Sequence, residues 1–358
     1  MKRETSLYLD LVRFTASLMV FLDHVGSGVI SGGFLWRFMG LGSPAVIVFF
    51  VLSGWVIAYV VDRGESTPKD YFVARAARIY SVALPAIALV LVLDAVGGTF
   101  RPDLYARLEA TNPNPGHPFL SIILSAFFLN AIWNVALAPG TDGPYWSLGY
   151  ECPYYLMAGL ALFLSGRTRV VAIALTGLLV GPHVLSLFPI WLLGFGCYRL
   201  TGKKPIPFRY GSAMFAASTI MLAVLVAGIV LRKIGMMPPI GGHGPKDVLV
   251  DYGIGLLVAV HLVGASAISQ SWGWIRLVAR PIRWLAGATF SLYLFHLPIL
   301  IFINAVLPLR QDSWTFRLIL VAGTLALVFL LAELTERRKA GWRQLFDRLA
   351  SPAAAMRT

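Results

Sequence analysis

Long apolar segments follow one another along nearly the whole chain and are separated by short polar connections. Ten of them come close to the roughly 20 residues that an α-helix needs to cross a bilayer. The polar stretches are too short to form a separate soluble domain. The pattern predicts an all-α fold, a polytopic helical bundle integral to a membrane, with about ten transmembrane helices. The ten predicted spans are Leu7–Val29, Pro44–Val61, Ile79–Val96, Phe119–Leu137, Tyr145–Leu164, Arg169–Tyr198, Gly211–Leu231, Tyr252–Ser269, Ile282–Leu307 and Phe316–Leu334.

The sixth segment, Arg169–Tyr198, contains Pro182 and Pro189, and proline interrupts helices. The segment therefore crosses the membrane once, or as two short pieces. Charge favours one crossing, because ten spans with an inner N-terminus place most Lys and Arg residues in inner segments. Eleven spans would place Lys203, Lys204 and the basic C-terminal segment outside. We therefore predict ten spans with both termini cytoplasmic.

Residues 1–335 are predicted to form one transmembrane domain, and residues 336–358 a cytoplasmic basic amphipathic tail. The stretch AELTERRKAGWRQLFDRL alternates apolar and basic residues at helical spacing, which is typical of a helix lying along a membrane surface. The N-terminal MKRETSLYLD is basic, but the span that follows carries Asp10, Arg13 and His24 and has no clear cleavage site. We therefore expect it to be retained rather than removed as a signal peptide.

Composition agrees with the membrane assignment, since 58% of the residues are hydrophobic and only 13% are charged. The net charge of +13 is explained by basic cytoplasmic loops, so no nucleic-acid partner is expected. The two cysteines, Cys152 and Cys197, both lie in apolar segments without paired spacing. A disulfide or metal framework is not expected, and no metal-binding residues are assigned.

The first predicted span carries three ionisable side chains on nearly one helical face. At about 100° per residue, eleven positions return to almost the same side, so Arg13 and His24 lie together, with Asp10 close to that side. Such groups within a membrane face a protein interior or a wet cavity and indicate a functional site. The alternative is a histidine that is hydrogen-bonded within the core of the bundle.

Four further segments are unusually polar or specific for their positions. They are FFVLSGW (Phe49–Trp55), RAARIY (Arg75–Tyr80), YWSLGYECPYYL (Tyr145–Leu156) and FSLYLFHLP (Phe290–Pro298). Together with the residues of the first span, they resemble the motifs of the membrane-bound acyltransferase family 3, in the same order. The members of this family are O-acyltransferases that modify polysaccharides and other carbohydrate-bearing molecules.

The resemblance implies that His24 is catalytic. A neutral imidazole can take the proton from an acceptor hydroxyl as that hydroxyl attacks a thioester carbonyl. Asp23 adjoins His24 but points about 100° away around the helix. It is a secondary candidate for a catalytic role, as the residue that orients the ring.

The resemblance also implies that Arg75 and Arg78 bind an acyl-CoA donor, and that Arg13 and Tyr80 belong to the donor-binding set. Paired guanidinium groups can bind phosphates, and coenzyme A is cytoplasmic. A positive-inside anchor is the simpler interpretation of such a pair. The family often has proline where this chain has Ser81.

Glu151 matches the glutamate of a family motif that begins here at Trp146. A buried carboxylate is costly unless it is protonated, paired or in contact with water. We expect Glu151 either to pair with Arg75, Arg78 or Arg13, or to be catalytic.

Residues assigned to substrate contact or to support of the catalytic groups are Asp10, Ser53, Trp146 and His296. For Ser53, close helix packing is the alternative, and His261 is expected to be a core residue.

These assignments predict a membrane enzyme that transfers an acyl group, acetyl by family frequency, from acyl-CoA to a hydroxyl of a carbohydrate or glycosylated acceptor. The protein would lie in a bacterial inner membrane among lipids, with a separate periplasmic partner left open. With Arg75 and Arg78 at the inner face and His24 in the outer part of its span, transfer would cross the membrane. The rival class is a transporter or flippase of lipid-linked sugars.

Overall fold

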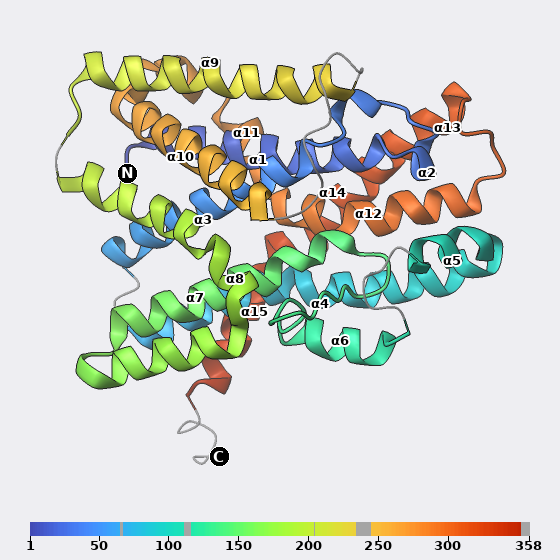
Figure 1. Cartoon of the computed structure of the whole chain (residues 1–358), viewed down its shortest axis with the longest axis horizontal. Helices are drawn as coiled ribbons and strands as arrows, with labels where there is room; N and C mark the ends of the chain where they lie inside the picture. The colour runs from blue at the N-terminus through green and yellow to red at the C-terminus, as the bar shows by residue number, and fades with distance from the viewer. Residues whose placement is uncertain (65–66, 111–115, 204, 234–244, 352–358) are drawn as a thin grey trace. The chain divides into compact units, whose positions relative to one another are not determined.

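The computed structural model describes residues 1–64, 67–110, 116–203, 205–233 and 245–351. All regular secondary structure in these ranges is helical, which confirms the all-α fold (Figure 1). Residues 352–358 of the predicted tail lie outside the described ranges. The α-helices are α1 (Arg3–Val25), α2 (Gly28–Ser31), α3 (Gly42–Arg63), α4 (Pro68–Phe100), α5 (Pro102–Ala110), α6 (Pro118–Ala126), α7 (Leu148–Phe163), α8 (Gly166–Lys203), α9 (Phe208–Lys233), α10 (Pro245–Ile268), α11 (Ala279–Ala286), α12 (Thr289–Val306), α13 (Trp314–Leu318), α14 (Thr324–Leu334) and α15 (Lys339–Leu349). Short helical turns are η1 (Trp36–Phe38), η2 (Gly143–Ser147), η3 (Ser269–Ser271), η4 (Gly273–Arg276), η5 (Ile319–Gly323) and η6 (Glu336–Arg338).

Within the described ranges, eight helical stretches are long and apolar enough to cross a membrane. They overlap eight of the ten predicted spans, so the polytopic membrane fold is confirmed while the number ten is not. The stretches are Arg3–Val25, Gly42–Arg63, Pro68–Phe100, Gly166–Gly202, Phe208–Leu231, Val248–Ser271, Thr289–Val306 and Trp314–Leu349. The predicted ninth span, Ile282–Leu307, begins too early, because residues 279–286 form the separate helix α11.

The predicted fourth span, Phe119–Leu137, is wrong as a continuous helix. Its helix, α6, ends at Ala126 after 9 residues, about 14 Å, which is less than half of the roughly 30 Å hydrocarbon core. The predicted fifth span corresponds to η2 followed directly by α7, which has 16 residues. That α-helix is about 24 Å long, and only together with η2 does it approach the thickness of the membrane core.

The interruption predicted in the sixth segment is present in α8. The break lies at Gly181, immediately before Pro182, where the backbone has φ 82° and ψ 176°. Glycine adopts this conformation without strain because it has no Cβ. A Cβ there would also lie 2.9 Å from Cγ of Trp133. The helix continues through Pro189, so only one of the two prolines marks an interruption.

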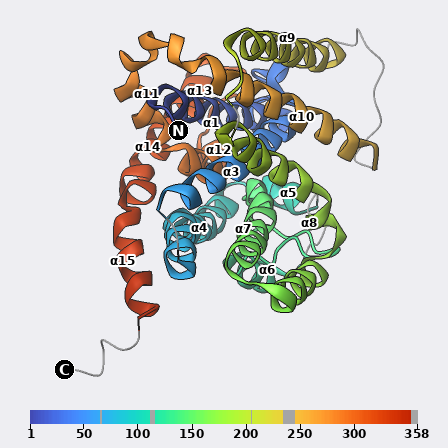
Figure 2. The ribbon, with the colours of Figure 1, turned by 90° about the vertical axis from the view of Figure 1, so that its left-hand side faces the viewer.

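The chain divides into two compact units, each built from two separate stretches of sequence. Unit 1 consists of Met1–Val60 and Ser186–Thr289, and unit 2 of Val61–Leu185 and Phe290–Thr358. In unit 1, α1 packs against α11, and α10 lies alongside α9, as Figures 1 and 2 both show. Buried side chains of Leu7, Ile275 and Ile282 form the core between α1 and α11.

Unit 2 is organised around α4, which contacts α5, α6, α7 and α15. The helix begins with a side-chain cap, because the hydroxyl of Thr67 accepts the Asp70 N–H at 3.1 Å, and Pro68 occupies the first turn. The tail helix α15 lies against α4, with the Phe346 ring 5.8 Å from the Tyr80 ring and Lys69 Nζ 2.5 Å from Ser351 Oγ. The apolar face of the predicted tail is thus used in part for packing within unit 2.

Candidate active site

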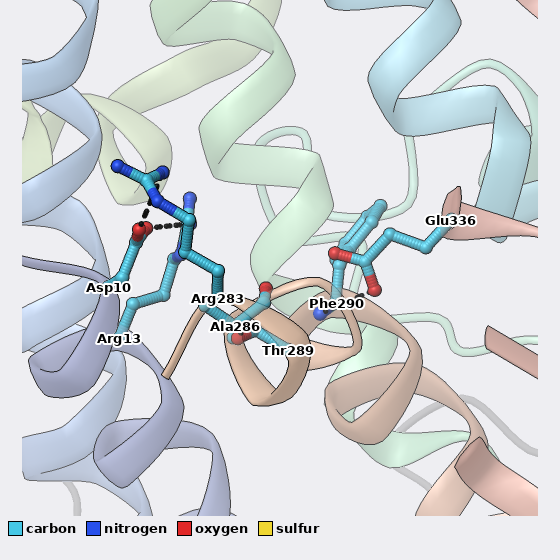
Figure 3. Close-up of polar contacts among 7 residues, drawn as sticks. All are labelled: Asp10, Arg13, Arg283, Ala286, Thr289, Phe290 and Glu336. Atoms are coloured by element: carbon cyan, nitrogen blue, oxygen red, sulfur yellow. Dashed lines mark hydrogen bonds and ion pairs between the residues drawn. The ribbon is translucent and has the colours of Figure 1, made fainter. Parts of the chain in front are cut away.

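The candidate site in unit 1 includes two arginines that pair with one carboxylate, that of Asp10 (Figure 3). Arg13 Nη2 lies 2.7 Å from Asp10 Oδ1, and Arg283 Nη1 of α11 lies 3.4 Å from Asp10 Oδ2. The Asp10 side chain is only 15% exposed, so its charge requires pairing. The helical spacing predicts that Asp10 and Arg13 lie together, but it does not reveal Arg283, which comes from a distant helix.

His24 lies in the last turn of α1, and its ring is half-buried. The carbonyl of Val20, one turn earlier, is a hydrogen-bond acceptor for the ring, and Asp23 is an electrostatic neighbour. Asp23 also accepts a hydrogen bond from the Gly40 N–H, and a Cβ on Gly42 would lie 2.9 Å from Asp23 Oδ2. Asp23 therefore fastens the segment that follows α1 against the end of the helix that carries His24.

In unit 2, Arg75 is a buried arginine on α4 with aromatic neighbours. Its guanidinium carbon lies 5.2 Å from the centre of the Tyr71 ring and 6.0 Å from that of Tyr155. The Tyr71 hydroxyl donates to the Tyr155 carbonyl at 3.0 Å, which ties α4 to α7. Ring faces attract a cation, so these contacts help to hold a buried guanidinium.

Glu151 on α7 accepts a hydrogen bond from the hydroxyl of Tyr155, one turn further along the same helix. The ring of Tyr155 thus contacts the Arg75 guanidinium while its hydroxyl contacts the Glu151 carboxylate. The sequence predicts either that Glu151 pairs with Arg75, Arg78 or Arg13, or that it is catalytic. In the structure Tyr155 contacts both Arg75 and Glu151. Tyr155 was overlooked, although its spacing of four residues from Glu151 places both on one helical face.

The remaining part of the Arg75–Tyr80 motif is anchored through its C-terminal residues. The Tyr80 hydroxyl donates to the Ala126 carbonyl at 3.1 Å, and its ring lies 5.1 Å from the ring of Phe128. Ser81, which stands where the family often has proline, donates its hydroxyl to the Arg78 carbonyl at 3.0 Å. The helix therefore continues past the motif, and Arg78 remains half-buried one turn beyond Arg75.

The two motifs that supply Ser147 and His296 meet in unit 2. The hydroxyl of Tyr293 on α12 donates to Ser147 Oγ at 2.9 Å, and Trp146 packs edge-on against Tyr150. His296, one turn after Tyr293, is fully buried, and its Nδ1 lies 2.7 Å from the Leu292 carbonyl. Since a carbonyl only accepts, the proton is on Nδ1.

The start of α12 is held by Glu336, a residue that sequence analysis did not single out. Its Oε2 accepts the backbone N–H groups of Phe290 at 3.1 Å and Ser291 at 2.9 Å, as Figure 3 shows for Phe290. A carboxylate at a helix N-terminus satisfies free N–H groups and complements the helix dipole. Glu336 thereby fixes the helix that carries Tyr293 and His296.

Ser53 and His261 have packing environments in unit 1. The indole Nε1 of Trp191 donates to Ser53 Oγ at 3.1 Å, where α3 and α8 run in close contact. His261 Nε2 pairs with the Tyr8 hydroxyl, and its Nδ1 lies 3.2 Å from Ser218 Oγ. Among the described residues, no group of three or more His, Cys, Asp or Glu side chains is arranged to hold a metal ion.

Comparison with known proteins identifies the family. The family of the acyltransferase domain (acyltransferase family 3) matches residues 6–333. The chain is 28% identical over 280 residues to the exopolysaccharide production protein ExoZ of Rhizobium meliloti, covering 72% of this chain and 76% of ExoZ. It is 26% identical over 222 residues to the O-acetyl transferase of Shigella phage Sf6, covering 57% of this chain and 61% of that protein. No solved structure matches the chain significantly.

A third relative is longer than this chain. The peptidoglycan O-acetyltransferase OatA of Listeria monocytogenes is 23% identical over 370 residues, and the match covers 92% of this chain but 54% of OatA. The chain thus spans about half the length of OatA, and the match includes most of this chain. With five motifs in family order and a match that extends from α1 to α14, the chain belongs to acyltransferase family 3.

Proposed function

We propose that this protein is a membrane O-acyltransferase that moves an acyl group, acetyl in the simplest case, from acyl-CoA to a hydroxyl of a cell-envelope polysaccharide. The observation that carries the proposal is the family match over residues 6–333. The names of the relatives support the acceptor class, since they describe exopolysaccharide production, O-acetyl transfer and peptidoglycan O-acetylation. A bacterial inner membrane is the location at which acyl-CoA and an envelope precursor are both within reach.

In this proposal His24 is the general base. The imidazole takes the acceptor's hydroxyl proton while the oxygen forms a bond to the thioester carbonyl carbon. The carbon–sulfur bond then breaks, and the coenzyme A thiolate leaves with the proton that His24 returns. The Val20 carbonyl favours one orientation of the ring, and Asp23 favours the imidazolium that forms during transfer.

Arg75 and Arg78 are proposed to bind the phosphates of the donor. They lie one turn apart on α4, and planar guanidinium groups pair with phosphates through two hydrogen bonds at once. Arg75 is already oriented by the rings of Tyr71 and Tyr155. With cytoplasmic termini, the arginines would lie on the side on which acyl-CoA is made, and His24 in the outer part of its span, so that the acyl group crosses the bilayer.

The donor assignment predicts different effects on two thioesters. Arg78→Ala and Arg75→Lys should raise the KM for acetyl-CoA about tenfold to a hundredfold, since a hydrogen bond to a charged group contributes about 1.5–3 kcal/mol. The KM for acetylpantetheine, which lacks the phosphates, should not change. The measurement is steady-state transfer to deacylated polysaccharide by the purified protein in nanodiscs.

Arg107→Ala is the matched control, because Arg107 is an exposed arginine of the same unit, paired with Asp103. It should leave both KM values unchanged. An equal increase for both thioesters in the Arg78 variant would contradict phosphate binding. A wild-type protein that moves intact lipid-linked sugar and never transfers label would favour the transporter.

A further inference from the structure

Asp142 lies in the connection between α6 and η2, and its side chain is completely buried, with 0% exposure. Within the described part of the chain, neither oxygen of its carboxyl group has a hydrogen-bond partner. The Tyr145 N–H, which favours the charged form of this carboxyl group, donates its hydrogen bond to the Asp142 carbonyl at 3.2 Å. Asp142 is therefore a strong hydrogen-bonding group at a buried position, and its carboxyl oxygens are not hydrogen-bonded by the residues that the structure describes.

Such a position is expensive for the folded chain. Burying a polar group without a hydrogen bond destabilises the folded state, and burying an ionised group destabilises it more. Burial, and secondarily the neighbouring Asp94, raises the pKa of Asp142 well above that of an ordinary aspartic acid. The group is therefore expected to be protonated, with one O–H to donate and further lone pairs to accept.

Hydrogen bonds hold the backbone on both sides of Asp142. The carboxylate of Asp94 on α4 accepts both the Thr141 N–H at 2.8 Å and the Thr141 hydroxyl at 2.7 Å. On the other side, the Asp142 N–H donates to the Pro139 carbonyl at 3.1 Å, and the Gly143 N–H to the Thr141 carbonyl at 2.9 Å. The backbone around Asp142 is thus held by hydrogen bonds on both sides.

Two tyrosines of unit 2, Tyr145 and Tyr293, are electrostatic neighbours of this carboxyl group. Tyr293 on α12 is an electrostatic neighbour of Asp142, and its hydroxyl donates to Ser147 Oγ at 2.9 Å. The Tyr145 hydroxyl is engaged elsewhere, with the Ser125 carbonyl at 3.0 Å. The cluster therefore combines a linked pair of hydroxyls with one carboxyl group that has no hydrogen-bond partner among the described residues.

The cluster is far along α4 from the proposed donor site. Asp94, which fixes the loop, and Arg75 are separated by nineteen positions of the same helix, or about 28 Å at 1.5 Å per residue. A donor held by its phosphates near Arg75 would have its nucleotide end remote from Asp142. The second substrate is therefore the better occupant.

We propose that Asp142, together with the Tyr293–Ser147 hydroxyl pair, forms a subsite that binds a hydroxyl group of the carbohydrate acceptor. The inference rests on the proposed function for the identity of its ligand. Asp142 donates its proton to one sugar oxygen and accepts from a neighbouring hydroxyl, which satisfies both carboxyl oxygens when the acceptor is present. The rival occupant is an ordered water molecule that the acceptor does not displace.

The test compares Asp142→Asn with wild type in nanodiscs. The Asn side chain has nearly the same shape but no carboxyl O–H, so it should raise the acceptor KM about tenfold, which corresponds to about 1.4 kcal/mol. The KM for acetyl-CoA and the melting temperature should stay at the wild-type values. Asp103→Asn, an exposed aspartate of the same unit, is the matched control and should change none of these quantities.

Infrared difference spectroscopy gives a second readout that does not need turnover. Methyl glycosides of glucose, galactose and rhamnose are added in turn, and the C=O stretch of a protonated carboxyl group is followed. A shift that is present in wild type and absent in Asp142→Asn supports the subsite, even if no acyl transfer is detected and the proposed function fails.

An unchanged acceptor KM in Asp142→Asn, or a carboxyl band that none of the glycosides shifts, overturns the proposal. The carboxyl group would then contact water or serve only the fold. If Asp142→Asn lowers the melting temperature, Asp142→Glu distinguishes the cases. If Asp142 contacts the ligand, Asp142→Glu should raise the acceptor KM while its melting temperature stays near that of Asp142→Asn. If the role of Asp142 is purely structural, Asp142→Glu should change the melting temperature and leave the acceptor KM unchanged.

Discussion

At the scale of single residues, two glycines decide how closely α3 and α8 approach in unit 1. A Cβ on Gly54 would lie 2.0 Å from the Trp191 carbonyl oxygen, and a Cβ on Gly194 would lie 1.9 Å from the Val51 carbonyl oxygen. Both contacts are to backbone, which cannot turn aside. Small residues permit such crossings in membranes, where packing supplies much of the stability between helices.

Gly54→Ala should therefore destabilise unit 1, by about 1–3 kcal/mol if the strain is that of an overpacked core. The measurement is the melting temperature in detergent. Gly196→Ala, two positions from Gly194 on α8, is the matched control, since a Cβ there meets nothing within 4 Å. Equal melting temperatures for the two variants would show that the helices separate without cost.

The sequence predicts residue roles best where the partner is on the same helix. The ion pair between Asp10 and Arg13 follows from their spacing alone, whereas the role of His24 stays a prediction. Asp142 could not be recognised, because a polar residue between two apolar segments is normally exposed to solvent, whereas here tertiary contacts bury it completely. The packing of Ser53 was foreseen as an alternative, but its partner Trp191 comes from a distant helix.

At the scale of elements, α12 depends on a residue outside it. Glu336 accepts two N–H groups at the start of the helix. Glu336→Ala should leave these groups buried without that acceptor and cost about 1–3 kcal/mol, while Glu336→Gln, which keeps an acceptor but loses the charge, should cost about 0.3–1 kcal/mol. Chemical or thermal unfolding in detergent measures both.

Glu333→Gln is the control for this pair of variants. Glu333 is half-exposed and forms a pair with Arg337, a type of surface interaction that contributes little. If Glu333→Gln and Glu336→Ala lowered stability equally, the stabilisation would come from the charge of this segment rather than from the helix start.

Hydropathy located most elements but failed at Phe119–Leu137. An apolar segment does not need to be helical when other parts of the protein satisfy its backbone. Here the Trp133 N–H donates to the Val180 carbonyl at 2.9 Å, and the Leu137 N–H to the Asn130 carbonyl at 3.0 Å. The first of these contacts reaches the residue before the break in α8, so the local sequence alone could not have revealed it.

At the scale of the whole molecule, the order of motifs along the chain was more informative than any count of spans. It predicted the acyltransferase family, which the match over residues 6–333 confirms. The proposed base His24 belongs to unit 1, and the proposed donor-binding pair, Arg75 and Arg78, belongs to unit 2. The roles of these residues remain predictions, and each can be tested separately.

The most direct test measures acetyl transfer by His24→Gln. Purified protein in nanodiscs is given radiolabelled acetyl-CoA and deacylated envelope polysaccharide, with His183→Gln, an exposed histidine, as control. Wild type and control should attach label to the polysaccharide as a base-labile ester. His24→Gln should keep its melting temperature and transfer about 100-fold less or slower still, the loss expected for a general base. Transfer by His24→Gln at the wild-type rate would contradict the account.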